Sequence, residues 1–181
     1  MKKSLLSLIM FVSLGAGWPS NSIYVLDRSW VSDSEAVVSL KTMSGHPTLL
    51  TLVYTHCPSA CPITVRRLKQ IKELAVQQKI PLTIGLVSMD SARDVPARLS
   101  KFRKEQQLSE DWKIFTGAED QVRELAVLLG FSYQKDEATG EFQHSNKIVL
   151  LDAQGAIQHS FDGMSTTPEE FIAIIKDLKT K

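Results

Sequence analysis

The chain contains two cysteines, and they stand close together in the stretch YTHCPSACPIT (54–64). Three residues separate Cys57 from Cys61. Residues four apart on a helical turn have β-carbons ~5–6 Å apart, whereas an unstrained disulfide needs ~3.5–4.5 Å. A metal ion between the two sulfurs removes that mismatch, so the spacing favours chelation. A disulfide is still allowed if Cys57 lies in a loop.

A proline follows each cysteine and indicates where a helix begins. The residue before a proline is disfavoured in the α region, while proline fits the first helical position. We therefore expect a helix from Pro62, with Cys61 at or next to its cap and Cys57 in the preceding loop. The positive end of the helix dipole would then lie near both sulfurs and favour their thiolate forms.

The number of available donors limits which metal the two thiols can bind. A structural zinc site needs four protein ligands, but the sequence has only these two cysteines and no second CxxC or HxxxH pattern. Copper(I) is soft and is satisfied by thiolate and imidazole at low coordination number. The sequence thus favours copper, with one of its four histidines as a third ligand.

The four histidines differ in their sequence context. His56 adjoins Cys57, but its side chain is expected to point the other way at a strand end, so we interpret it as a packing residue or as tuning the thiol. His46 lies in a turn and His159 in a hairpin strand, where both are expected to be surface or packing residues. His144 precedes a hydrophobic strand and is the best of the four on spacing alone.

Residues 1–17 have the features of a secretory signal peptide. Two lysines precede the apolar run 5–14, and three small residues follow it. The run is shorter than the ~20 residues of a spanning helix, so we expect cleavage near Ala16 or Gly17. Retention of the segment as an N-terminal membrane anchor is the alternative. Export to the periplasm would place the thiols in an oxidising compartment.

The rest of the chain has the composition of a globular domain. It is 43% hydrophobic and 23% charged over 181 residues, with a formal net charge of +1. That charge, and the lack of a basic run with interleaved aromatics, argue against nucleic acid and against an anionic membrane surface as partners. Membrane contact therefore depends on the N-terminal segment. Because no repeat or linker is visible, we expect one domain over residues 21–181.

Hydrophobic periodicity predicts strands that alternate with helices. The cysteines directly follow the first central strand, where a thioredoxin-like fold carries its reactive thiols. We expect an α/β, thioredoxin-like fold: a central mixed sheet flanked by helices, with an N-terminal β-hairpin extension. Strands are expected at 35–40, 48–55, 81–89, 112–115, 147–152 and 156–161, and helices at 62–78, 96–107, 119–129 and from Pro168, with Thr167 as its cap.

The cysteine motif and three further blocks resemble the Sco/SenC family, which assembles the binuclear copper site of cytochrome c oxidase. The resemblance extends from about Val38 to the C-terminus, with the blocks in the family's order. The blocks are YTHCPSACPIT (54–64), IGLVSMDSARDVPARLSKF (84–102), DWKIFTGAEDQVRELAVLLGFSY (111–133) and FQHSNKIVLLDAQGAI (142–157).

The resemblance implies a periplasmic copper chaperone whose metal ligands are Cys57, Cys61 and His144. The cargo would be a copper ion, Cu(I) or Cu(II), and the partner would be the copper-site subunit of cytochrome c oxidase. Another periplasmic copper chaperone and a thioredoxin-like reductant are further candidate partners. Asp90 matches an acidic position near the family's site, although a strand-end cap is its alternative role. Ser91 stands where the family often has proline, and the N-terminal apolar run is short for the anchor to the inner membrane that is typical of the family.

The same two cysteines allow a second function. As the catalytic residues of a thiol–disulfide oxidoreductase or redox sensor, Cys57 and Cys61 would reduce a target disulfide or report the redox state. His144 distinguishes the two functions, because copper binding needs the imidazole and disulfide exchange does not. A peroxidase and a passive module with a buried disulfide are weaker alternatives, and Met164 is expected to pack rather than to bind metal.

Overall fold

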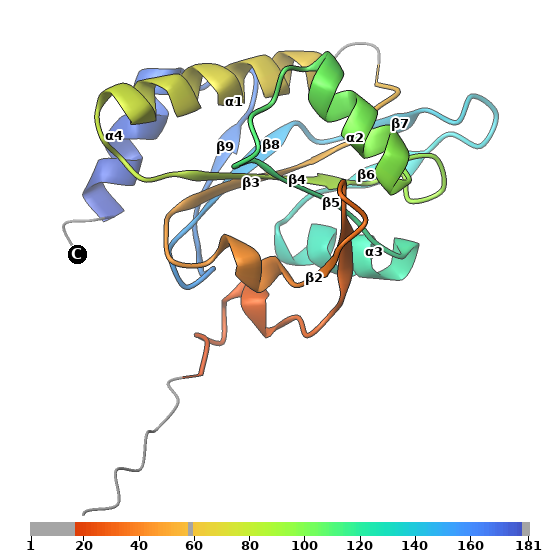
Figure 1. Cartoon of the computed structure of the whole chain (residues 1–181), viewed down its shortest axis with the longest axis horizontal. Helices are drawn as coiled ribbons and strands as arrows, with labels where there is room; N and C mark the ends of the chain where they lie inside the picture. Colours follow the sequence, from red (N-terminus) through yellow and green to blue (C-terminus); the bar gives the residue numbers. More distant parts are fainter. Residues whose placement is uncertain (1–16, 58–59, 179–181) are drawn as a thin grey trace, which may run out of the picture.

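The computed structural model describes residues 17–57 and 60–178 and is built on a seven-stranded mixed β-sheet (Figure 1). The strand order is β2-β1-β5-β4-β3-β8-β9. A separate two-stranded hairpin, β6–β7, lies outside this sheet. The strands are β1 (Trp30–Ser32), β2 (Val37–Val38), β3 (Thr48–Val53), β4 (Thr83–Ser88), β5 (Lys113–Thr116), β6 (Tyr133–Lys135), β7 (Phe142–His144), β8 (Lys147–Leu151) and β9 (Ile157–Asp162).

Helices cover both faces of the sheet. In Figure 1, α1 and α4 lie together on one face with α2 beside them, and α3 lies on the opposite face. Short 3₁₀ turns, Ile23–Val25 and Leu40–Met43, precede the first central strand. The α-helices are α1 (Ala60–Gln77), α2 (Pro96–Glu105), α3 (Glu119–Leu128) and α4 (Pro168–Leu178).

The central strand β3 is buried along its whole length. All six of its residues are buried, and its neighbours β4 and β8 are buried at nearly every position. A strand covered on both faces is expected to be continuously hydrophobic rather than alternating, which explains the run TLLTLV. Buried residues of these three strands form the centre of the hydrophobic core, together with apolar residues of α1, α3 and α4.

The directions of these strands bring three segments to one edge of the sheet. β3 and β4 are parallel, in the register Thr48↔Thr83 to Val53↔Ser88, so both end at that edge. β8 is antiparallel to β3, with Thr48 opposite Leu151, so β8 begins there. The loops after β3 and β4 and the segment before β8 are therefore neighbours in space.

The predicted mixed sheet flanked by helices is confirmed, and the antiparallel pair β1–β2 is the predicted N-terminal hairpin. The strand predicted at 35–40 is reduced to β2, because Glu35 adopts a positive φ of 67° in the turn and Leu40 begins a 3₁₀ turn. Hairpin β6–β7 was not predicted, since its short strands are only partly buried and carry a weak hydrophobic signal.

The start of α1 also differs from the prediction. The helix begins at Ala60, so Cys61 lies inside its first turn rather than at its cap. Proline is tolerated there because the first backbone N–H groups of a helix have no intrahelical partner. Pro62 is thus the third residue of the helix instead of the first.

The N-terminal segment 1–17, predicted as a signal peptide or anchor, lies outside the described residues except for Gly17. Within 17–57 and 60–178, no helix combines the length and apolar character that crossing a bilayer requires.

Thr167 caps α4 as the sequence predicts, and its loss should destabilise the domain. Its hydroxyl accepts a hydrogen bond from the Glu170 N–H (3.3 Å), and Glu170 Oε2 accepts one from the Thr167 N–H (2.7 Å). Replacing such a cap by alanine costs ~1 kcal/mol, which lowers the Tm of a domain this size by roughly 2–4 °C. Thermal unfolding followed by circular dichroism measures the change for Thr167→Ala. The neighbouring Thr166→Ala is the control, and equal Tm values for the two variants would contradict the assignment.

Candidate metal centre

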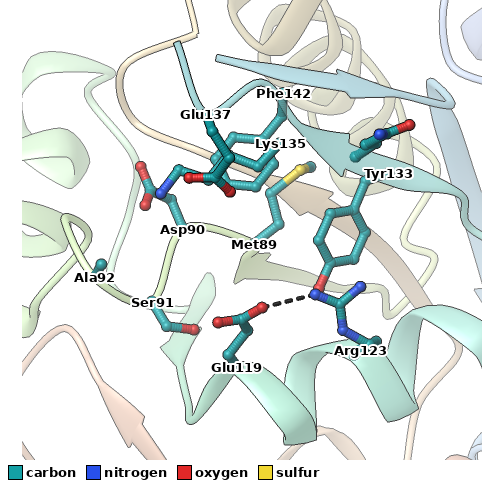
Figure 2. Close-up of a pocket in the computed structure, with 11 residues that line it drawn as sticks. Met89, Asp90, Ser91, Ala92, Glu119, Arg123, Tyr133, Lys135, Glu137 and Phe142 are labelled. Carbon is teal, nitrogen blue, oxygen red and sulfur yellow. Dashed lines mark hydrogen bonds and ion pairs between the residues drawn. The ribbon is translucent and has the colours of Figure 1, made fainter. Parts of the chain in front are cut away.

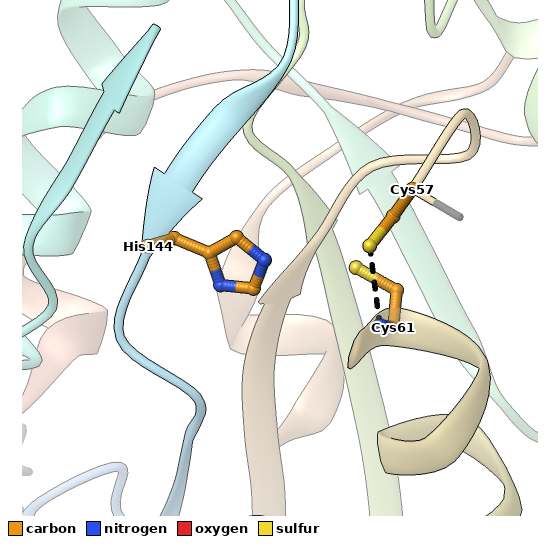
Figure 3. Close-up of side chains that lie close together, drawn as sticks. All are labelled: Cys57, Cys61 and His144. Carbon is orange, nitrogen blue, oxygen red and sulfur yellow. Dashed lines mark hydrogen bonds between the residues drawn. The ribbon is translucent and has the colours of Figure 1, made fainter. Parts of the chain in front are cut away.

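Three donor atoms converge at the edge of the sheet where β3 ends. The sulfurs of Cys57 and Cys61 and a ring nitrogen of His144 all lie within 4.8 Å of one another. In Figure 3 the imidazole points across the end of β3 toward the two sulfurs. An ion with bonds of ~2.0–2.3 Å holds its donors at most ~4.6 Å apart. The three side chains therefore need only small adjustments to share one ion.

The cysteines occupy the positions that their local sequence dictates. Cys57 lies in the loop after β3 and Cys61 in the first turn of α1, and no disulfide joins them. The Cys61 N–H donates a hydrogen bond to Cys57 Sγ at 3.3 Å (Figure 3). This contact places Cys57 Sγ at the N-terminus of α1, where the helix dipole stabilises negative charge.

Burial controls the protonation of Cys61. Its side chain is only 3% exposed, and this burial raises the pKa of the Cys61 thiol well above its ordinary value, with the nearby Cys57 adding to the rise. The expectation that Cys61 would favour its thiolate is therefore wrong, because desolvation by burial is the largest influence on its pKa. A metal ion must displace the proton of this thiol when it binds.

His144 presents one ring nitrogen to the site. His144 ends strand β7, whereas its sequence context had suggested a loop before the next strand. Its Nδ1 lies 3.0 Å from the carbonyl oxygen of Ser145. A carbonyl can only accept, so Nδ1 carries the proton and Nε2 keeps its lone pair for a metal. This is the usual arrangement of a metal-binding histidine.

Tyr54 packs between the cysteine loop and strand β7. Its ring centroid lies 5.1 Å from that of Phe142 and 6.0 Å from that of His144, edge-on at 87° to the latter. Burial, and to a lesser extent the nearby Cys57, raises the pKa of Tyr54 to about 12, so its phenol stays neutral. Sequence reasoning missed this residue, because a tyrosine after a buried strand looks like ordinary core.

Asp94 fixes the loop that carries Cys57. Its buried carboxylate accepts hydrogen bonds from the Thr55 N–H (2.9 Å), the Thr55 hydroxyl (2.6 Å) and the Ser88 hydroxyl (2.6 Å). His56 Nδ1 lies 3.6 Å from the same carboxylate. Asp94 was also missed, although a second acid four residues after Asp90 was a visible signal.

The remaining candidates lie away from the three donors. His56 points to the Asp90–Asp94 side, and these three residues form a second group of donors within 4.8 Å of one another. The Asp90 carboxylate is ion-paired with Arg93, and the Asp90 N–H donates to the Ser88 hydroxyl at the end of β4. Because Asp94 is already hydrogen-bonded at both oxygens, we assign this second group to structure.

Three other residues are accounted for without metal binding. The His159 ring packs on Phe161 at 4.4 Å. His46 precedes β3, and its carbonyl accepts a bond from the Thr48 hydroxyl. Met164 was expected to pack, but its side chain is 51% exposed.

Comparison with known sequences gives the family. The sequence model of the SCO1/SenC family matches residues 24–180. The chain belongs to the SCO1/SenC family. The SCO1 protein homolog of Bacillus subtilis is 27% identical over 146 residues, which cover 79% of this chain and 75% of that protein.

Solved structures of SCO1/SenC proteins have the same fold. The structure of BsSco, described as a member of the Sco family of cytochrome c oxidase assembly proteins with a disulfide switch, superposes with a TM-score of 0.76 at 23% identity, covering 90% of this chain and 96% of that one. Arabidopsis thaliana ScoI with copper bound gives 0.74 at 20% identity, covering 84% and 96%. The predicted thioredoxin-like fold and family are confirmed.

The burial of Cys61 predicts slow, pH-dependent alkylation in the reduced, metal-free protein. Only the thiolate reacts, and the raised pKa lowers the thiolate fraction of Cys61 near pH 8. Iodoacetamide labelling of Cys61, located by tandem mass spectrometry, should therefore be at least ~10-fold slower in the folded protein than in urea. Its rate should keep rising with pH beyond 9. Equal rates in the folded and denatured chains would contradict this account.

Proposed function

We propose that this protein is a periplasmic metallochaperone that binds one copper ion through Cys57, Cys61 and His144. It would deliver that ion to the binuclear copper site of cytochrome c oxidase. The observation that carries the proposal is the convergence of two sulfurs and an imidazole nitrogen within 4.8 Å. The family supports it, since BsSco is described as one of the cytochrome c oxidase assembly proteins.

The donor set favours copper over other metals. Two soft sulfurs and one imidazole suit Cu(I), whose preferred coordination number is low. A structural zinc ion needs four protein ligands, and the convergent group has three. The solved structures of the Arabidopsis, Bradyrhizobium japonicum and yeast relatives carry copper, which supports the same cargo here, in the Cu(I) or the Cu(II) state.

An ion held by three ligands has an open coordination position through which it can pass to an acceptor. An incoming thiolate or imidazole of the acceptor can enter a fourth position before a ligand of the chaperone leaves, so the ion is never without donors. His144 is the ligand best suited to leave, because it is half-buried and belongs to the small hairpin β6–β7. The proposed acceptor is the copper-site subunit of the oxidase, and a second periplasmic copper chaperone is the proposed donor.

Residues 1–17 are the proposed export signal, retained or removed, ahead of a domain at 21–181. A retained segment would tether the domain to the inner membrane. In the periplasm the two thiols meet oxidants, and only reduced cysteines bind Cu(I) as thiolates. A thioredoxin-like reductant is therefore part of the proposal.

A second function, thiol–disulfide exchange, is favoured by the contact of the Cys61 N–H with Cys57 Sγ. Cys57 and Cys61 would be its catalytic residues. Their two thiols would give up two protons and two electrons to form one disulfide, and the target's disulfide would become two thiols. The disulfide switch described for BsSco supports this candidate.

Removing the imidazole separates the two functions. His144→Ala should weaken Cu(I) binding by more than the ~10–100-fold that loss of an outer partner of a ligand costs. Its rate of disulfide exchange should stay near that of the wild type, because exchange uses only the sulfurs. Cu(I) titration against a chromogenic chelator measures the affinity, and reaction with a model disulfide measures exchange.

Two controls make the outcome decisive. His159→Ala removes an imidazole far from the sulfurs and should bind copper like the wild type. Cys57→Ser should lose both activities. Weak binding by the wild type, or equal affinities for wild type and Cys57→Ser, would refute the copper proposal. If His144→Ala lost exchange but kept its copper affinity, thiol–disulfide exchange would become the primary function.

A further inference from the structure

A side-chain hydrogen bond joins the helix of Cys61 to the segment of His144. The Thr64 hydroxyl lies 2.6 Å from Asn146 Oδ1. Thr64 stands three residues after Cys61 and therefore on the same face of α1. Asn146 stands two residues after His144, directly before β8. The bond thus couples the positions of two predicted metal ligands that lie far apart in the sequence.

Both partners of this bond are held by further contacts. The Thr64 hydroxyl also lies 3.1 Å from the Ala60 carbonyl oxygen in the first turn of α1, and its single proton is shared between that acceptor and the closer Asn146 Oδ1. The Asn146 carbonyl accepts a bond from the Gly163 N–H at 2.7 Å. A β-carbon on Gly163 would lie only 3.2–3.4 Å from Asn146 atoms, which shows how closely the two residues approach. Asn146 therefore has a defined position between α1 and the loop before α4.

The hairpin that carries His144 has few other attachments. β6–β7 forms no ladder with the seven-stranded sheet. One side of it borders a polar cavity of about 440 Å³, shared with α3 and the loop after β4 (Figure 2). There Arg123 is paired with Glu119 on its own helix and lies over the Tyr133 ring at 5.6 Å. On this side the hairpin borders the cavity, although Tyr133 and Phe142 are partly buried against the core.

We infer that Thr64 and Asn146 are positioning residues for the copper site, holding the His144 imidazole at the distance from Cys61 that one ion requires. The inference rests on the proposed copper binding. Outer partners that orient a ligand typically change metal affinity by ~10–100-fold when they are removed. Neither residue offers a donor to the ion in this role, so each acts through His144.

The test is a pair of substitutions that differ by one hydroxyl. Thr64→Val keeps the shape of the side chain and removes the bond, and it should weaken Cu(I) binding ~10–100-fold. Thr64→Ser keeps the hydroxyl and should restore the affinity. Thr48→Val, at the far end of β3, removes another buried hydroxyl bond (3.2 Å to the Met43 carbonyl) and is the matched control. It should bind copper like the wild type even if it lowers the Tm.

A double-mutant cycle shows whether the effect passes through His144. In a His144→Ala background, Thr64→Val should cause no further loss of affinity. Asn146→Ala should reproduce the effect of Thr64→Val, and the two together should be no weaker than either alone. The rate of disulfide exchange should not change in any of these variants, since the sulfurs keep their places.

The outcomes separate this inference from the proposed function. If the wild type binds copper tightly and His144→Ala does not, the copper site stands. In that case unchanged affinity in both Thr64→Val and Asn146→Ala would overturn the positioning role. If Thr64→Val lowered the copper affinity equally in the wild type and in the His144→Ala background, the positioning role would also be overturned. The bond would then act on the cysteines or on the fold. Failure of the wild type to bind copper would refute the proposed function itself.

Discussion

The antiparallel pairing of β8 with β3 is the constraint on which the site depends. Cys57 and Cys61 are close in sequence and meet wherever β3 runs into α1. His144 has no such local connection to them. His144 lies beside the two cysteines because β8 begins at the edge of the sheet where the parallel strands β3 and β4 end. The buried Thr51 hydroxyl, which donates to the Lys147 carbonyl at 2.6 Å, fixes the start of β8 at that edge.

The electrostatics of the three donors would favour a soft ion. A buried thiol resists ionisation, and burial is the largest cause of the raised pKa of Cys61. A cation that forms strong bonds to sulfur offsets the desolvation that otherwise keeps the proton in place. An imidazole ligand adds a donor without adding charge to the ion's surroundings. The loop anchored by Asp94 and the ring of Tyr54 hold this arrangement before any ion is bound.

The sequence was sufficient to predict the fold class and the cysteine pair. It was less informative about the histidine and about the residues that hold the site in place. The buried strands have clear hydrophobic runs, and the Cys–Pro steps indicate a helix start to within two residues. His144 was singled out by family resemblance, since spacing alone left four candidates. Asp94, Tyr54, Thr64 and Asn146 act through contacts between distant segments, which no local pattern encodes. The protonation of Cys61 was misjudged because the dipole can be read from sequence and the degree of burial cannot.

Hairpin β6–β7 stands apart from the hydrogen-bonded ladder of the main sheet. His144, the proposed third ligand, is therefore carried by a hairpin outside the main sheet, while the two cysteines lie where β3 leads into α1. Swinging the hairpin outward breaks ring contacts and a few polar bonds but leaves every rung of the central sheet intact. Release of an ion held there would therefore not require the central sheet to unfold.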